Sequence, residues 1–270
     1  MMEALLNDFL KTAITAAGLA ADIIMKNLGQ LANIDLRTKA EFDFVTKVDR
    51  WSEEAIMQSV RARYPDHRFL TEEGLKEDPG GYRWIIDPLD GTTNYIHGYP
   101  AFSVSIALEC ERKIVLGVVL DPFRDELFYA IMGGGAFLNH RQIHVSRVTA
   151  IARSLIATGF PFRAKGMIDD YLTAFKAVFM KVSDIRRAGS AAMDLAYVAA
   201  GRSEGFFELK LSTWDVAAGS LLVTEAGGIV TDFGGKGDYL STGNIIAGNA
   251  VIQPMILEIV KGVFSGKVVQ

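Results

Sequence analysis

The chain has 270 residues, a formal net charge of −4 at pH 7, and 50% hydrophobic against 22% charged residues. This balance is typical of a folded globular protein and excludes an extended disordered chain. The negative charge argues against a nucleic-acid binder that works through a broadly basic surface, although a local basic patch stays open. Cys110 is the single cysteine, so no disulfide can form within the chain, and we expect a reducing, cytoplasmic location.

The N-terminal segment is apolar but does not have the pattern of a membrane span. Apolar residues recur at three- and four-residue steps over residues 3–27, which predicts one amphipathic helix. Asp8, Lys11 and Asp22 interrupt this segment, and it lacks the basic start and the cleavage site of a signal peptide. We therefore expect no association with a membrane.

The rest of residues 1–150 predicts a second helix followed by a sheet. The helix runs from Asp49 to about Arg63, where Tyr64-Pro65 ends it. Strand-like runs follow at residues 67–71, 82–87, 102–110, 114–120 and 126–131. Short polar turns link the last three runs, which predicts an antiparallel meander. This N-terminal half is therefore predicted to be α+β.

Residues 151–270 alternate between strands and helices. Strands are predicted at 154–157, 184–187, 205–208, 229–231 and 245–247, and helices near 167–180, 191–200, 215–226 and 251–263. That alternation is typical of an α/β arrangement. No Ser/Pro-rich linker separates the halves, so we expect an α/β protein whose halves, 1–150 and 151–270, pack as one unit.

The densest chemical signal follows an apolar strand and reads Asp87-Pro88-Leu89-Asp90-Gly91-Thr92-Thr93-Asn94. Pro88 favours a turn, so the side chains of Asp87 and Asp90 can converge instead of alternating across a strand. Two convergent carboxylates suit a hard cation. Asp90, Thr92 or Thr93 could cap a following helix, and the amides of Gly91 and Thr92 would then point at an anion bound in front of them. The alternative is that both acids serve only the turn and the helix cap.

Three further acidic features fit either a structural or a chemical role. Glu72 and Glu73 follow the strand-like run 67–71, where a sheet delivers side chains to its rim, but taken alone this pair is more typical of a solvated loop. Asp215 and Asp49 each stand at a predicted helix start, where an aspartate is usually an N-cap. Taken singly, each of the three favours the structural interpretation.

Taken together, these segments resemble the inositol monophosphatase family. The resemblance is carried by Thr71-Glu72-Glu73, by Trp84-Ile85-Ile86-Asp87-Pro88-Leu89-Asp90-Gly91-Thr92-Thr93-Asn94 and by Trp214-Asp215-Val216-Ala217-Ala218-Gly219. These motifs agree with the family in order, spacing and flanks, and agreement extends over almost the whole chain. The resemblance implies a layered αβαβα sandwich of the inositol monophosphatase and fructose bisphosphatase type, dependence on Mg²⁺, inhibition by lithium and a homodimer.

The resemblance also implies a set of metal ligands at the matched positions. Glu72, Asp87 and the carbonyl of Leu89 would hold a first Mg²⁺, and Asp87, Asp90 and Asp215 would hold a second. A third, weaker Mg²⁺ would lie near Glu72.

Catalytic and substrate-binding roles are implied in the same way. The catalytic set is Asp49, Thr92 and Glu72. Thr92 would be hydrogen-bonded to the nucleophilic water, and Asp49 would accept the proton of that water. The substrate-binding set is Asp90, Gly91, Thr92, Ala191 and Glu208, in which the amides of Gly91 and Thr92 hold phosphate. Lys39 lies near a basic position of some relatives and stays outside this set.

Such a cluster makes physical sense only around cations. Neighbouring carboxylates ~4 Å apart repel each other by roughly 1–4 kcal/mol per pair. Two cations would stabilise the attacking and leaving oxygens of a phosphoryl transfer, and one would lower the pKa of a bound water. We therefore expect hydrolysis of a small phosphorylated polyol or sugar, with myo-inositol monophosphate as the leading substrate.

Two groups of alternatives stay open. Fructose-1,6-bisphosphatase, histidinol-phosphate phosphatase and NADP(H) phosphatase share the implied metal site, so the acids do not choose between them. A regulatory protein that binds RNA or the transcription machinery belongs to a different class. The complete acid set favours the enzyme, because a binding module has no physical need for five carboxylates in one place.

Overall fold

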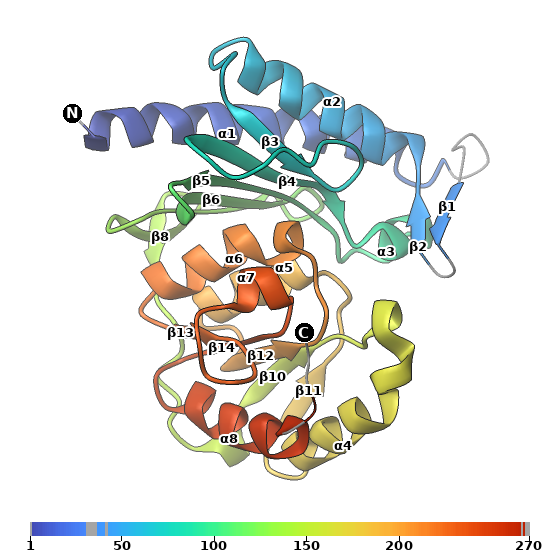
Figure 1. The fold of residues 1–270 in the computed structure, drawn as a ribbon, viewed down its shortest axis with the longest axis vertical. Helices are drawn as coiled ribbons and strands as arrows, with labels where there is room; N and C mark the ends of the chain where they lie inside the picture. The colour runs from blue at the N-terminus through green and yellow to red at the C-terminus, as the bar shows by residue number, and fades with distance from the viewer. Residues whose placement is uncertain (1, 31–36, 41–42, 266, 268–270) are drawn as a thin grey trace.

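The computed structural model describes residues 2–30, 37–40, 43–265 and 267, and its elements form five layers (Figure 1). In the figure, α1 and α2 lie above a seven-stranded sheet, α5 and α6 lie between that sheet and a five-stranded one, and α4 and α8 lie below. The six helices are Met2–Asn27 (α1), Lys47–Arg61 (α2), Ile168–Phe179 (α4), Ala191–Ala199 (α5), Thr213–Glu225 (α6) and Ile252–Phe264 (α8). This order confirms the predicted αβαβα sandwich and its α/β class.

The seven-stranded sheet follows the chain in strand order, from β3 to β9. Its strands are Arg68–Thr71 (β3), Tyr82–Asp90 (β4), Ser103–Cys110 (β5), Lys113–Asp121 (β6), Glu126–Ile131 (β7), Gly135–Leu138 (β8) and Arg141–Ile143 (β9). β3 and β4 pair in parallel, and each later neighbouring pair is antiparallel. The predicted meander is confirmed and continues through β8 and β9.

The five-stranded sheet has the order β11-β10-β12-β14-β13. Its strands are Leu155–Thr158 (β10), Asp184–Arg186 (β11), Gly205–Glu208 (β12), Ile229–Thr231 (β13) and Ile245–Gly248 (β14). β10 pairs in parallel with β11 and β12, whereas β14 pairs antiparallel with β12 and β13. The sheet is therefore mixed, and its five strands match the predicted ones to within one residue or two.

The middle helices are buried on both sides. Most residues of α5 and α6 are buried, as expected for a helix that is apolar around its whole circumference and lies between two sheets. Small residues allow the close approach that this layer needs. A Cβ atom on Gly117 of β6 would lie 2.8 Å from the carbonyl oxygen of Ala218 in α6.

Two helices begin two residues earlier than predicted, after the N-caps Thr46 in α2 and Ser212 in α6. Asp49 and Asp215 are therefore the third residues of their helices, so the expectation of N-caps was wrong for both. Each carboxylate instead accepts the backbone N–H of the N-cap residue, the reciprocal half of a capping box.

Several short elements were not predicted, because three to five residues are too few to establish a period. They are β1 (Arg37–Ala40) and β2 (Asp43–Val45), which pair antiparallel, α3 (Thr92–Ile96), α7 (Tyr239–Thr242), β8 and β9. Within the described residues, none of the helices is both long and apolar enough to cross a membrane. The division into halves at residue 150 stays a prediction.

An aromatic cluster around His67 attaches α1 to the large sheet. The His67 ring stacks on Tyr64 and Tyr82 at centroid distances of 4.8 and 4.9 Å, and Phe9 of α1 packs edge-on at 5.4 Å. Trp84 Nε1 donates a hydrogen bond to His67 Nδ1 at 3.0 Å, which requires that Nδ1 carry no proton. Burial lowers the pKa of His67 from its ordinary value of 6.5, although the charge of Asp66 raises it in part.

We predict that acidification weakens this attachment. Because the folded pKa of His67 lies below the unfolded one, the unfolded chain binds a proton first as the pH falls below about 6.5, and stability decreases from there. His67→Phe should unfold more easily than wild type at about pH 7.5, and the difference should shrink toward about pH 5. Thermal melts across this range measure it, and a difference that is independent of pH contradicts the assignment.

Candidate metal centre

Asp87 and Asp90 lie at the end of strand β4, where its pairing with β5 is irregular. β4 pairs regularly with β5 up to Asp87 and resumes at Asp90, so the predicted strand end at residue 87 is corrected to Asp90. Pro88 has no N–H to donate to the ladder, which accounts for the break. Asp87 Oδ1 accepts the N–H of Leu89 at 3.0 Å, so the chain turns locally between the two acids as expected.

Asp215 reaches the same place from the first turn of α6. Its Oδ2 accepts the N–H of Ser212 at 2.7 Å, which fixes the carboxylate at the helix start. Ligand oxygens of Asp87, Asp90 and Asp215 all lie within 4.8 Å of one another, and the three residues are 9% exposed or less. Three acids that are far apart in the sequence thus form one buried cluster.

The start of α5 fixes Asp90. Asp90 Oδ2 accepts hydrogen bonds from Ser190 Oγ at 2.6 Å and from the N–H of Ala192 at 2.8 Å. Ser190 is the N-cap residue of α5, and Ala192 belongs to its first turn. The cluster therefore stands where β4 meets the N-terminal ends of two middle helices.

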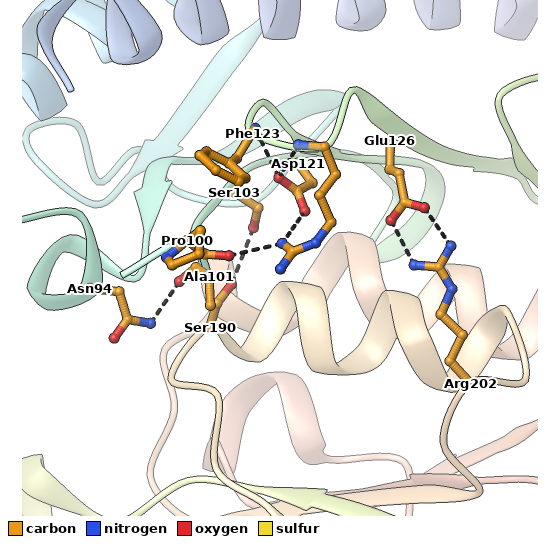
Figure 2. Close-up of polar contacts among 10 residues, drawn as sticks. Asn94, Pro100, Ala101, Ser103, Asp121, Phe123, Glu126, Ser190 and Arg202 are labelled. Atoms are coloured by element: carbon orange, nitrogen blue, oxygen red, sulfur yellow. Dashed lines mark hydrogen bonds and ion pairs between the residues drawn. The ribbon is translucent and has the colours of Figure 1, made fainter. Parts of the chain in front are cut away.

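Figure 2 shows the polar contacts that hold α5 on the large sheet. At its N-terminal end, Ser190 Oγ lies 3.3 Å from Ser103 Oγ in β5. Beyond its C-terminal end, Arg202 pairs with both carboxylate oxygens of Glu126 in β7, at 2.6 Å for one of them. Asn94 Nδ2 in α3 also donates to the carbonyl oxygen of Ala101 at 2.6 Å. A second hydrogen bond, from Asn94 Nδ2 to the carbonyl oxygen of Ala188 at 2.8 Å, ties α3 to the approach to α5.

Asp49 stands behind Thr92 and not in the cluster. Its Oδ2 accepts the N–H of Thr46 at 2.9 Å, and its Oδ1 lies 3.0 Å from Thr92 Oγ1. Thr92 Oγ1 is also 3.1 Å from the carbonyl oxygen of Leu89. Burial raises the pKa of Asp49, although the hydrogen bonds from Thr46 and Thr92 oppose the shift.

The electrostatics of the cluster call for a cation. Burial raises the pKa of Asp87 well above 3.8, and the charges of Glu72, Asp90 and Asp215 raise it further. Burial and then the charge of Asp215 raise the pKa of Asp90 to about 7. Burial, and then mutual repulsion, oppose ionisation of these carboxylates in the absence of a cation. Together they form an oxygen-only donor set, and such a set fits Mg²⁺.

A cavity of about 340 Å³ opens in front of these acids. Nine of the ten predicted site residues line it, namely Glu72, Asp87, Leu89, Asp90, Gly91, Thr92, Ala191, Glu208 and Asp215. The tenth, Asp49, is connected to the cavity through Thr92. Lys39 lies in β1, and its side chain is outside the described residues.

Glu208 ends β12 and lies directly against Gly159, where a Cβ atom would be 2.1 Å from Glu208 Oε1. Only a glycine leaves room for the carboxylate at that point. Burial raises the pKa of Glu208 well above 4.5, the charge of Asp194 raises it further, and Arg187 lowers it. Glu208 therefore lies near a second buried acid, Asp194, and near the guanidinium group of Arg187, which lines the same cavity.

The predicted site set omits several residues of this region, of which four have a clear contact or burial. Phe162 and Arg187 line the cavity, Asp194 is buried in α5, and Asn94 ties α3 to the approach to α5. Asp194 carried a signal that could have been used, because it is the one charged residue in an otherwise apolar helix. No local sequence pattern marks the other three, because their contacts with the site form only when the chain folds.

Fold and site define a layered α/β protein in which the end of strand β4 and the start of helix α6 bring three buried carboxylates to one cavity. The model of the inositol monophosphatase family matches residues 5–263. The chain belongs to the inositol monophosphatase family.

Similar proteins agree with this membership. A Nus factor SuhB from Pseudomonas aeruginosa is 46% identical over 246 residues, which cover 89% of this chain and 91% of the relative. An inositol-1-monophosphatase from Mesorhizobium japonicum is 42% identical over 260 residues, which cover 96% and 98%. A crystal structure of extragenic suppressor protein suhB from Bartonella henselae superposes with a TM-score of 0.91 at 42% identity, covering 94% and 98%.

Asp87→Asn is expected to stabilise the metal-free protein. The substitution removes one of several repelling charges, while the Asn side-chain oxygen can still accept the N–H of Leu89. In EDTA at about pH 8 the free energy of unfolding should rise by about 1–3 kcal/mol. The gain should shrink at about pH 5, because the raised pKa leaves the wild-type carboxyl protonated there.

Denaturant unfolding of both proteins in EDTA and in Mg²⁺ measures this effect. Mg²⁺ should reverse the order, because it stabilises only the chain that keeps the ligand. Equal stabilities in EDTA at the higher pH contradict the electrostatic account.

Proposed function

We propose that this protein is a Mg²⁺-dependent phosphatase that hydrolyses a small phosphate monoester, with myo-inositol monophosphate as the leading substrate. The observation that carries the proposal is the buried cluster of Asp87, Asp90 and Asp215 at the wall of a cavity. Membership in the inositol monophosphatase family supports phosphatase activity, and a 42% identical relative bears the name inositol-1-monophosphatase.

The residues that would hold the cations follow from the geometry and the family resemblance together. Glu72, Asp87 and the Leu89 carbonyl would hold one Mg²⁺, and Asp87, Asp90 and Asp215 a second, with a third and weaker ion near Glu72. Bound there, Mg²⁺ would neutralise charge on the phosphoryl oxygens and lower the pKa of water.

Asp49 and Thr92 would orient the water that attacks phosphorus. The Thr92 hydroxyl has one proton and two acceptors within reach, Asp49 Oδ1 and the Leu89 carbonyl. When it donates to Asp49, its own lone pairs can accept a hydrogen bond from water. The raised pKa of Asp49 suits a group that takes up a proton during the reaction.

The substrate would lie across the cavity. The amides of Gly91 and Thr92 would hold the phosphate, and Gly91 adopts a left-handed φ of 91° that lets the chain turn closely there. Asp90, the Ala191 amide and Glu208 would contact the hydroxyl groups of the organic part. Carboxylates accept hydrogen bonds that hydroxyl groups donate, which favours a polyol or a sugar over an apolar alcohol.

Phosphate release from a panel of monoesters tests the assignment. The purified protein with Mg²⁺ should hydrolyse myo-inositol monophosphate, and Asp87→Asn should lower kcat/KM by at least about 10³-fold. Fructose 1,6-bisphosphate, histidinol phosphate and NADP(H) complete the panel. A kcat/KM for inositol phosphate several hundredfold below that for another substrate moves the assignment to that substrate, whereas unchanged hydrolysis by Asp87→Asn contradicts the metal site.

A regulatory function is the second candidate, and the observation that favours it is the name Nus factor SuhB of the 46% identical relative. Binding to RNA or to the transcription machinery could coexist with hydrolysis. Asp87→Asn separates the two, because retained partner binding without hydrolysis indicates independent functions. The homodimer, the sensitivity to lithium and the cytoplasmic location stay predictions.

A further inference from the structure

A second acid on helix α2 has no role in the site described so far. Glu53 follows Asp49 by four residues, so both project from the same face of the helix. It is 5% exposed. A buried carboxylate is costly unless it is hydrogen-bonded, which makes the groups around Glu53 informative.

Glu53 contacts the turn that follows β3. Its Oε2 accepts the backbone N–H of Glu73 at 2.8 Å. Its Oε1 lies beside Gly74, where an added Cβ atom would be 3.0 Å away. The carboxylate therefore bonds the turn at Glu73, immediately after Glu72, and leaves little room for a side chain at Gly74.

The same turn is fixed from its other side. Thr71 Oγ1 accepts the N–H of Gly74 at 3.2 Å and of Leu75 at 2.8 Å, and the Thr71 N–H donates to the Leu75 carbonyl at 2.7 Å. The N–H of Glu72 donates to the carbonyl of Ile86 in β4 at 3.2 Å. Glu72 thus lies between anchored peptide groups, and Glu53 supplies the anchor on its C-terminal side.

We propose that Glu53 is a positioning residue that fixes the backbone after Glu72 and so holds the Glu72 carboxylate beside Asp87. The inference rests on the proposed function, in which Glu72 is a Mg²⁺ ligand. It gives α2 two tasks, since Asp49 orients Thr92 and Glu53 orients Glu72 one turn later. Outer groups that orient metal ligands typically change metal affinity by 10–100-fold when they are removed.

The test compares Glu53→Ala with two matched variants. Glu53→Gln keeps an oxygen that can accept the Glu73 N–H. Glu54→Ala removes the neighbouring acid, which is exposed and accepts a hydrogen bond from Gln58 on the same helix. Calorimetric titration with Mg²⁺, in the absence of substrate, gives the affinity. Amide hydrogen exchange at Glu73 in the metal-free protein reports the contact itself.

Glu53→Ala should weaken Mg²⁺ binding by about tenfold or more and speed exchange at Glu73, while kcat at saturating Mg²⁺ stays within a few-fold of wild type. Glu53→Gln should recover most of the affinity, and Glu54→Ala should match wild type. Gly74→Ala, which crowds the same contact, should shift the affinity in the same direction by less. Should Glu53→Ala not fold, Glu53→Met fills the volume without an acceptor and takes its place.

The outcomes separate this inference from the function on which it rests. Wild-type protein that binds Mg²⁺ and hydrolyses substrate, together with unchanged Mg²⁺ affinity in Glu53→Ala, overturns the positioning role alone. Wild-type protein that binds no Mg²⁺ overturns both. Loss of kcat at saturating Mg²⁺ in Glu53→Gln also overturns the inference, because it indicates that the charge itself takes part in the reaction.

Discussion

Mutual repulsion among buried carboxylates is the constraint on which the arrangement of this protein depends. Asp87, Asp90 and Asp215 are each at most 9% exposed, and their ligand oxygens lie within 4.8 Å of one another. Burial and the neighbouring charges raise the pKa of Asp87 and of Asp90, so the cluster is unfavourable without a cation. The layered core is what keeps the acids together despite that cost.

The protein offsets the repulsion with hydrogen bonds from helix starts. The N-cap N–H of α6 bonds Asp215, and the first turn of α5 bonds Asp90. Helix N-termini carry partial positive charge, so two of them beside the cluster favour negative charge there. The same bonds fix the side chains in direction, which a metal site needs before any ion arrives.

Much of this could be predicted from the sequence, and the limits have physical causes. Long helices and strands have a period that can be recognised, and the acids of the site stand in motifs with fixed spacing. The helix starts at Asp49 and Asp215 were misplaced because a capping box puts an acid at the third position and an aspartate alone resembles an N-cap. Glu53 carries no local signal, because its role arises only when α2 packs beside the turn after Glu72.

The most direct test of the central claim is the position of the cations. Anomalous diffraction from crystals soaked in Mn²⁺, an ion that shares the oxygen ligands of Mg²⁺, locates them independently of any activity. The account predicts peaks within coordination distance, about 2.0–2.3 Å, of the oxygens of Asp87, Asp90 and Asp215. Fully occupied crystals whose peaks lie elsewhere, with these three carboxylates unligated, would contradict it.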